Sequence, residues 1–294
     1  MPLVPMTQLL ADAAHGGYAV CYCEAWNLES FQAVIQAAEE LRSPIIAGFN
    51  GGFLMCASNA GPENLPYYAG MALALRRASV PAAFLLNETD SLSQIKQGIN
   101  LGFNAVMVEN ERLQLDEYRQ LVKQVVEIAH SHGASVEAQI GRLPDGSGHS
   151  AAETTHPALA RAFAEETSID ALAVAVGNVH ILTTGNAILD LTALETIHEQ
   201  VRLPLVLHGG TGIPLDVAQD CIRRGVAKIN FGTVLKQAYL EAIRGKLAAY
   251  RAPMSPHPFL GMGGEQDILL AGLEAVKTKV KQLLQAFGSV GKAI

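Results

Sequence analysis

Short apolar runs alternate along the chain with longer stretches in which apolar residues recur every three or four positions. The short runs are typical of buried parallel strands, and the longer stretches are typical of amphipathic helices. Eight runs predict strands: Ala19–Glu24, Pro44–Phe49, Ala82–Glu88, Ala105–Glu109, Ala134–Ile140, Ala171–Gly177, Pro204–His208 and Ala227–Asn230. The helical pattern is clearest in six stretches: Leu28–Leu41, Leu115–His132, Ala158–Thr167, Ala193–Val201, Leu215–Arg224 and Leu235–Tyr250.

This repetition predicts the fold class. Repeated strand–helix units imply parallel pairing with right-handed crossovers, and eight such units are typical of a closed (β/α)8 TIM barrel. An open, doubly wound sheet is the alternative. We expect residues 1–294 to form one α/β domain with an extra C-terminal helix over Gln266–Ala286, which could pack on the barrel or on a second subunit.

Composition narrows the functional classes. With 294 residues and 49% hydrophobic content, the chain can bury a sizeable core. A formal net charge of −7 argues against nucleic acid as a partner, because a nucleic-acid backbone needs a basic surface. No apolar run is long enough to cross a membrane, Met1–Pro5 lacks a secretory pattern, and the four cysteines form no CxxC pair. We therefore expect a cytoplasmic protein without a membrane partner.

Acidic and imidazole side chains gather at the predicted strand ends, where TIM barrels carry their chemistry. His180 and His208 follow neighbouring strands, and their imidazoles suit zinc or a related divalent ion. Glu88 is the preferred third ligand because two histidines and a glutamate form a known zinc set, with Glu109 and Glu24 as alternatives. In the other interpretation, the two histidines only hydrogen-bond to backbone.

Two adjacent strand ends also predict an anion site. Gly209, Gly210 and Thr211 follow one strand, and the run Asn230, Phe231, Gly232 and Thr233 follows the next and leads into a helix. Exposed backbone amides and a helix N-terminus favour phosphate here, at the position where TIM barrels commonly bind it. The loop Leu143–Ser150 is predicted to be an exposed lid, and its Asp145 or His149 could act as an acid or base.

Segments along the whole chain resemble one enzyme family. The similar segments are Tyr18–Val20, Asn27–Glu29, Gly102–Met107, Ser135–Ala138, Asp170–Gly177, Leu207–Gly212 and Lys228–Asn230. In combination they resemble the class II, zinc-dependent ketose-bisphosphate aldolases, and the tagatose-bisphosphate/fructose-bisphosphate aldolase branch most of all. The resemblance implies reversible aldol cleavage through an enediolate, with a divalent metal, a phosphorylated sugar as substrate, and a homodimer or homotetramer.

The resemblance also assigns residues. By it, His180 and His208 are two of the three zinc ligands, while Gly209–Thr211 and Asn230–Thr233 bind the phosphate of dihydroxyacetone phosphate. Ile181 stands where the family has a glycine whose backbone helps to bind phosphate or a monovalent cation.

Several site positions depart from the family pattern. Asn87-Glu88 replaces an Asp-His pair that supplies the catalytic acid/base and the remaining zinc ligand. An amide cannot exchange a proton near neutral pH, so Glu88, Glu109 or a lid residue would have to replace the missing aspartate; Asn87 and Glu109 are the catalytic candidates. Leu270 aligns with the arginine that binds the distal phosphate, which argues against a bisphosphate. Gln139 replaces a glutamate, and Glu24 replaces a common asparagine.

The leading prediction is therefore a lyase with a diverged active site that cleaves a ketose phosphate. Two alternatives stay open on the sequence alone. One is a non-catalytic homologue that binds a sugar phosphate. The other is an isomerase or a decarboxylating lyase that uses the same barrel.

Overall fold

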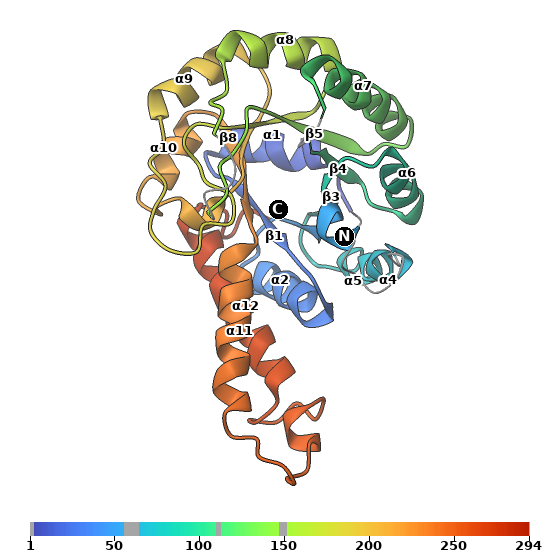
Figure 1. The fold of residues 1–294 in the computed structure, drawn as a ribbon, viewed down its shortest axis with the longest axis vertical. Coiled ribbons are helices and arrows are strands. Elements are labelled where there is room, and N and C mark those ends of the chain that lie inside the picture. Colours follow the sequence, from blue (N-terminus) through green and yellow to red (C-terminus); the bar gives the residue numbers. More distant parts are fainter. Residues whose placement is uncertain (1–2, 56–64, 110–112, 147–151, 294) are drawn as a thin grey trace.

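The computed structural model describes residues 3–55, 65–109, 113–146 and 152–293, and eight parallel strands form its centre. They pair in sequence order, and β8 returns to β1, so the barrel is closed (Figure 1). The strands are β1 Val20–Glu24, β2 Ile45–Asn50, β3 Ala82–Thr89, β4 Ala105–Val108, β5 Ser135–Ile140, β6 Ala171–Val174, β7 Leu205–Leu207 and β8 Val226–Phe231. The predicted TIM barrel is confirmed, and each predicted strand overlaps an observed one.

Helices surround this barrel in the order that the alternating pattern predicts. The longer ones are α2 Leu28–Glu40, α6 Leu92–Leu101, α7 Leu115–Ser131, α8 Pro157–Thr167, α9 Leu191–Gln200, α11 Thr233–Leu247 and α12 Ile268–Ala286. Shorter ones are α3 Gly51–Leu54, α4 Leu65–Gly70, α5 Ala72–Leu75, α10 Ala218–Arg223, and the 3₁₀ turns η1 Gly210–Gly212 and η2 His257–Phe259. Among the described helices, none combines the length and apolarity that a membrane crossing requires.

One helix, α1 (Met6–Gly16), was not predicted and covers the amino-terminal end of the barrel. Just ahead of it, the Val4 N–H donates to the Ala82 carbonyl at the start of β3. Its buried face packs against inward-facing strand residues, many of which are alanines. Small side chains inside the barrel leave space at this end, and the apolar face of α1 fills it.

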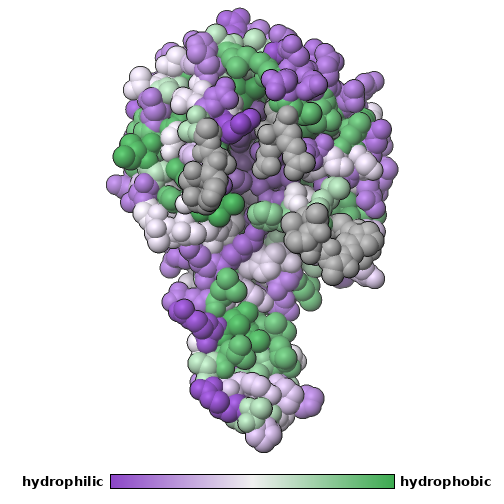
Figure 2. All heavy atoms as spheres, viewed as in Figure 1, coloured by the Kyte–Doolittle hydropathy of each residue, from purple (hydrophilic) through white to green (hydrophobic). Residues whose placement is uncertain are grey.

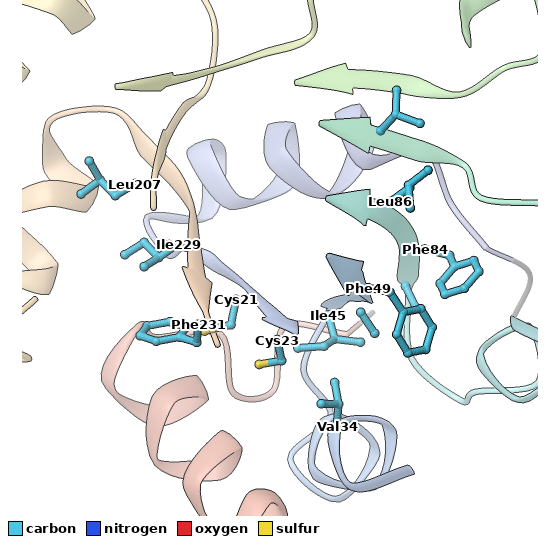
Figure 3. Close-up of a cluster of buried hydrophobic side chains, with 14 of the residues drawn as sticks. Cys21, Cys23, Val34, Ile45, Phe49, Phe84, Leu86, Leu207, Ile229 and Phe231 are labelled. Atoms are coloured by element: carbon cyan, nitrogen blue, oxygen red, sulfur yellow. The ribbon is translucent and has the colours of Figure 1, made fainter. Parts of the chain in front are cut away.

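The strand alternation separates two environments. Cys21 and Cys23 of β1 point outward into the apolar layer beneath the helices, together with Phe49, Phe84 and Phe231 (Figure 3). Neighbouring residues of β1 point the other way, because successive side chains in a strand face opposite sides. Glu24 is thereby directed into the carboxyl-terminal end of the barrel.

The C-terminal helix α12 packs within the chain. Its buried residues lie against α2 and α11, and Gly272 leaves room for the ring of Tyr239. The sequence left open whether this helix packs on the barrel or on a second subunit, and the structure shows it packed against the protein's own barrel and α11. The outer parts of α11 and α12, with the loop between them, form an arm that projects from the barrel (Figure 1).

Candidate active site

A local irregularity of β3 directs Glu88 into the site. The pairing of β3 with β4 shifts register between Leu86 and Thr89, and Glu88 has a φ of 54°. A non-glycine residue in this left-handed region is strained by about 1–3 kcal/mol, a feature common at functional sites. The side-chain amide of Asn50, at the end of β2, donates to Glu88 Oε2 and holds the carboxylate in place.

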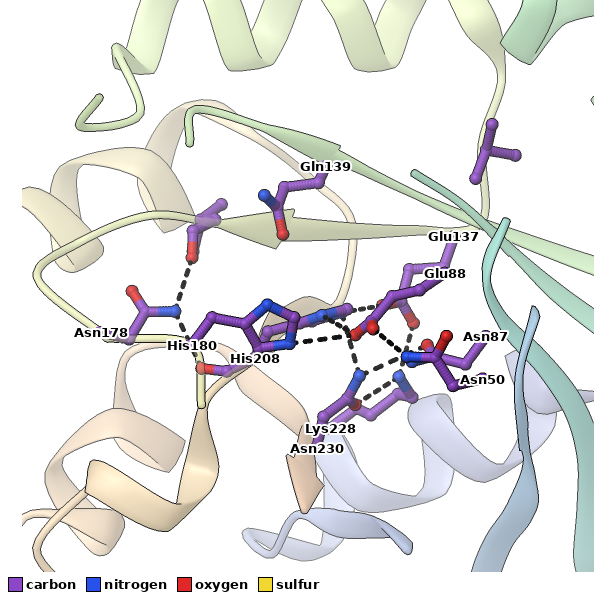
Figure 4. A network of polar contacts seen from close by, with 12 residues as sticks. Asn50, Asn87, Glu88, Glu137, Gln139, Asn178, His180, His208, Lys228 and Asn230 are labelled. Atoms are coloured by element: carbon purple, nitrogen blue, oxygen red, sulfur yellow. Dashed lines mark hydrogen bonds and ion pairs between the residues drawn. The ribbon is translucent and has the colours of Figure 1, made fainter. Parts of the chain in front are cut away.

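The two predicted histidines face the same carboxylate oxygen. His208 Nδ1 lies 3.1 Å from Glu88 Oε1, and His180 Nε2 lies 3.4 Å from the same atom (Figure 4). The two imidazole centroids are 6.4 Å apart. Each of the three residues thus offers one ligand atom, and these atoms all lie within 4.8 Å of one another.

A second carboxylate orients His208 from behind. Glu137, which is fully buried on β5, has its Oε1 2.8 Å from His208 Nε2. Its other oxygen, Oε2, lies 2.8 Å from Nζ of the fully buried Lys228. Lys228 also donates to Asn230 Oδ1 at 2.6 Å. An imidazole that is held at one nitrogen by a carboxylate presents the other nitrogen in a fixed direction, as metal-binding histidines do.

The donor set fits a divalent metal. Two imidazole nitrogens and one carboxylate oxygen form a three-residue set that leaves coordination positions open for water or substrate. Of the nitrogens of His208, Nδ1 is directed towards Glu88, while Nε2 is engaged by Glu137. The arrangement therefore has both the ligands and the supporting partner that such a site needs.

Charge and burial oppose each other throughout this cluster. Burial alone would lower the pKa of His208, but Glu137 and Glu88 outweigh it and raise the pKa to about 9. Burial would raise the pKa of Glu88, yet the hydrogen bonds and charges of His180 and His208 hold it well below its ordinary value. Without a metal, the cluster is therefore held together by a protonated imidazole between two carboxylates.

Glycine backbone shapes the adjacent turn after β7. Gly209 has a φ of 69°, and a Cβ there would lie 2.2 Å from the Val179 carbonyl oxygen. The next residues form η1, and Thr211 Oγ1 accepts a hydrogen bond from the Val234 N–H at 3.1 Å. This contact joins the turn after β7 to the first turn of α11. The predicted phosphate segments therefore lie side by side.

One cavity of about 240 Å³ connects the cluster with these turns. Its lining includes Tyr22, Glu24, Asn50, Phe53, Asn87, Glu88, His180, Ile181, Gly209, Thr211, Asn230–Thr233, Lys236, Gln237 and Leu240. The lining thus combines polar residues with the apolar side chains of Phe53, Ile181 and Leu240. In Figure 2, polar residues are visible in the hollow in the middle of the face shown.

Glu24 lies directly against the predicted phosphate segment. Its Oε1 forms an ion pair with Lys236 Nζ on the first turn of α11. A Cβ on Gly232 would come within 2.5 Å of Glu24 Oε2. Burial raises the pKa of Glu24, against the opposing effect of Lys236. A carboxylate and an ammonium therefore share the turn where the sequence predicts phosphate.

Other predicted residues have different positions. Asn87 is buried and lines the cavity, and Asn230 Nδ2 lies 3.5 Å from its Oδ1. Glu109 follows β4, half-buried, with its N–H donating to the Thr89 carbonyl. Among the described residues that line the cavity, Glu109 does not occur.

The remaining predicted residues lie near His180. Ile181 follows it with a φ of 53° and is 46% exposed. The described start of the predicted lid lies against this segment, because Asp145 forms a β-bridge with His180 and the Gly146 N–H donates to the His180 carbonyl at 2.7 Å. His149 lies outside the described residues.

Sequence reasoning missed two cations of the site. The sequence places Lys228 in a strand and in one of the segments that resemble the family, and Lys236 in a helix, without a role for either charge. A signal for Lys228 was present, since a lysine inside a mostly apolar, buried strand needs a counter-charge. Lys236 carried no such signal, because a lysine on a helix at the barrel surface is ordinarily exposed.

Comparison with known proteins agrees with this fold. The family described as fructose-bisphosphate aldolase class-II matches residues 4–292. The YdjI aldolase from Escherichia coli K12 is 29% identical, with a TM-score of 0.81 over 99% of this chain and 100% of that one. Fructose-bisphosphate aldolase from Campylobacter jejuni, at 18% identity and a TM-score of 0.76 over 99% of this chain and 97% of that one, shares the fold.

A closed parallel barrel with a Glu/His/His cluster beside glycine-rich turns defines the class of protein. The chain belongs to the class-II fructose-bisphosphate aldolase family, whose members are metal-dependent lyases.

Proposed function

We propose that residues 1–294 form one catalytic domain that cleaves a ketose phosphate, or a related carbonyl compound, by a reversible aldol reaction. The observation that carries this proposal is the cavity lined both by Glu88 and His180 of the Glu88–His180–His208 cluster and by the glycine turns after β7 and β8. A cluster that can hold a divalent ion then lies within reach of the carbonyl of a substrate whose phosphate is bound at the turns.

Each part of the cavity has a proposed role. Glu88, His180 and His208 would hold the metal, with zinc as the proposed ion, and a bound ion supplies a Lewis acid for the substrate carbonyl. Backbone N–H groups of Gly210–Thr211 and Gly232–Thr233 would bind phosphate, helped by the N-terminus of α11. Together these contacts would fix the three-carbon unit while the carbon–carbon bond breaks.

Proton transfer needs a different residue from the family aspartate. The amide of Asn87 can donate or accept a hydrogen bond to a substrate hydroxyl, but it cannot take up the proton. We propose Glu109, at the end of the neighbouring strand β4, as the carboxylate that replaces it. Its half-buried position beside the β3 bulge supports this role. Glu109 does not line the cavity in this structure, so the Glu109 carboxylate would have to approach the substrate hydroxyl when substrate binds.

Self-association is proposed through the projecting arm. The exposed apolar side chains Leu247, Leu260 and Met262 belong to the end of α11 and the loop after it, and apolar atoms gather on the arm in Figure 2. Patches of this kind commonly mark protein interfaces. A homodimer or homotetramer would bury these side chains, and light scattering of wild type and Leu247→Glu would test this, because we expect the variant to have the lower molar mass.

The proposed function is tested by metal content and cleavage together. Purified protein is loaded with zinc, and release of dihydroxyacetone phosphate is followed for a panel of ketose phosphates. We expect stoichiometric zinc and measurable cleavage, and we expect His208→Ala to lose both, whereas His132→Ala, an exposed histidine at the end of α7, keeps both. Bound sugar phosphate without any cleavage would instead favour a non-catalytic binding protein.

A further inference from the structure

Lys236 is the cation best placed to meet a phosphate among the described residues that line the cavity. Lys228 is fully buried beneath the site and pairs with Glu137. Lys236 instead projects from the first turn of α11, beside the Gly232–Thr233 amides. Its Nζ lies 4.5 Å from the centroid of the Phe53 ring and 5.9 Å from that of Trp26.

The structure gives this cation an internal partner. Glu24 Oε1 pairs with Lys236 Nζ, while Oε2 packs against Gly232, the residue that opens the predicted phosphate turn. Glu24 is only 9% exposed, so water screens its charge weakly. A phosphate placed on this turn would meet the carboxylate at close range, and two anions in a poorly screened site repel each other.

We propose that Glu24 is a specificity-determining residue: it occupies the Lys236 ammonium, so that a phosphate group must compete with it for that charge. The inference rests on the proposed phosphate site. The glycine-rich backbone then contributes binding affinity that does not depend on Glu24. Glu24 determines how much more tightly a ligand with a doubly charged phosphate binds than a ligand with an uncharged hydroxyl group at the same position. The site is expected to discriminate weakly between a phosphorylated ketone and its unphosphorylated counterpart.

The test measures ligand binding to the full-length protein by calorimetry, without turnover. Probes are inorganic phosphate, dihydroxyacetone phosphate and uncharged dihydroxyacetone. Glu24→Gln keeps the side-chain volume and removes the charge. We expect it to tighten the Kd of both phosphate probes about tenfold and to leave dihydroxyacetone within about twofold.

Control variants separate this effect from a general change of charge. Glu274→Gln removes a carboxylate from an exposed ion pair on α12 and should leave all three Kd values unchanged. The double variant Glu24→Gln/Lys236→Gln should lose the gain, because the freed ammonium is its source. Glu24→Asn, which shortens the side chain away from Gly232, should behave as Glu24→Gln does.

Some outcomes would overturn the inference. A phosphate Kd that stays within about twofold, or weakens, in Glu24→Gln would show that Glu24 does not compete for Lys236. If phosphate still binds more tightly in the double variant, the gain in affinity does not come from the Lys236 ammonium. A loss of kcat without tighter phosphate binding would assign Glu24 to proton transfer instead. Failure of the proposed function looks different: metal-loaded protein would cleave no ketose phosphate, whatever the phosphate Kd.

Discussion

Two regions line the same cavity but differ in the groups that they present to it. One consists of the turns after β7 and β8, and the other of the ends of β1 and β3. After β7 and β8, glycine backbone makes the surface, and Gly209 tolerates a positive φ that a side chain would resist. At the ends of β1 and β3, the carboxylates of Glu24 and Glu88 form the surface of the cavity instead.

The two sides also differ in how they compare with the family pattern that the sequence resembles. The glycine turns after β7 and β8 match that pattern, whereas Glu24, Asn87 and Glu88 depart from it. The backbone is retained where a phosphate is proposed to bind, but charged side chains differ at both places, because Glu24 lies against Gly232 and Glu88 belongs to the proposed metal cluster. Four predictions test this difference between retained backbone and changed side chains.

The largest expected effect comes from breaking the support beneath His208. Glu137→Gln leaves Lys228 buried without a counter-charge and frees one side of the imidazole. We expect a loss of about 3–5 kcal/mol in the free energy of unfolding by urea, and metal affinity lower by about 10–100-fold. The exposed Glu127→Gln of α7 serves as the control, and a change in Glu137→Gln within 0.5 kcal/mol of it would contradict this role.

Placing an aspartate at position 87, at the end of β3, should increase the rate of cleavage. Asn87→Asp places an exchangeable carboxyl in the cavity next to Glu88. If proton transfer limits cleavage, the rate should rise about tenfold or more, because general acid–base catalysis contributes on the order of 10²–10⁴. Steady-state cleavage is compared with Asn100→Asp, an exposed site on α6. An unchanged rate would mean that the missing acid is not the limiting defect.

Metal binding should release protons. Without metal, Glu88 and Glu137 raise the pKa of His208 from 6.5 to about 9, and the pKa of His180 is also raised. The charged imidazole therefore stabilises the fold fully below pH 6.5, and this contribution is lost as pH rises through about 9.

At pH 7.5, a metal must displace these protons, so we expect about one to two protons released per ion. Calorimetry in buffers of different ionisation enthalpy measures the number. Metal affinity should rise with pH up to about 9. Release of no proton would show that His208 is not a ligand.

The smallest expected effect concerns the backbone beside His180. Ile181 has a φ of 53°, a region that costs a β-branched residue about 1–2 kcal/mol. Ile188, also exposed in the same loop, is free of a positive φ. We expect Ile181→Gly to be more stable than Ile188→Gly by about 1 kcal/mol in thermal unfolding. Equal stabilities would mean that the backbone at Ile181 stores no strain.

The sequence was sufficient for elements whose pattern is local. Each strand contains a short apolar run, and the positions at or just after the ends of these runs predict Glu88, His180 and His208 at one rim of the barrel. Helix α1 was missed because it pairs with no strand and only fills the alanine-lined end of the barrel.

Contacts between residues of distant elements could not be predicted from the pattern of apolar and polar positions. The Glu24–Lys236 and Glu137–Lys228 pairs join residues more than 90 positions apart, and only the closed barrel brings them together. The lid prediction at His149 stays a prediction.

The most direct test of the central claim is anomalous diffraction from crystals soaked with zinc. The account predicts one strong peak with Glu88 Oε1, His180 Nε2 and His208 Nδ1 each about 2.0–2.2 Å away. A peak elsewhere, or imidazoles that turn away from a common centre in the soaked crystal, would contradict it.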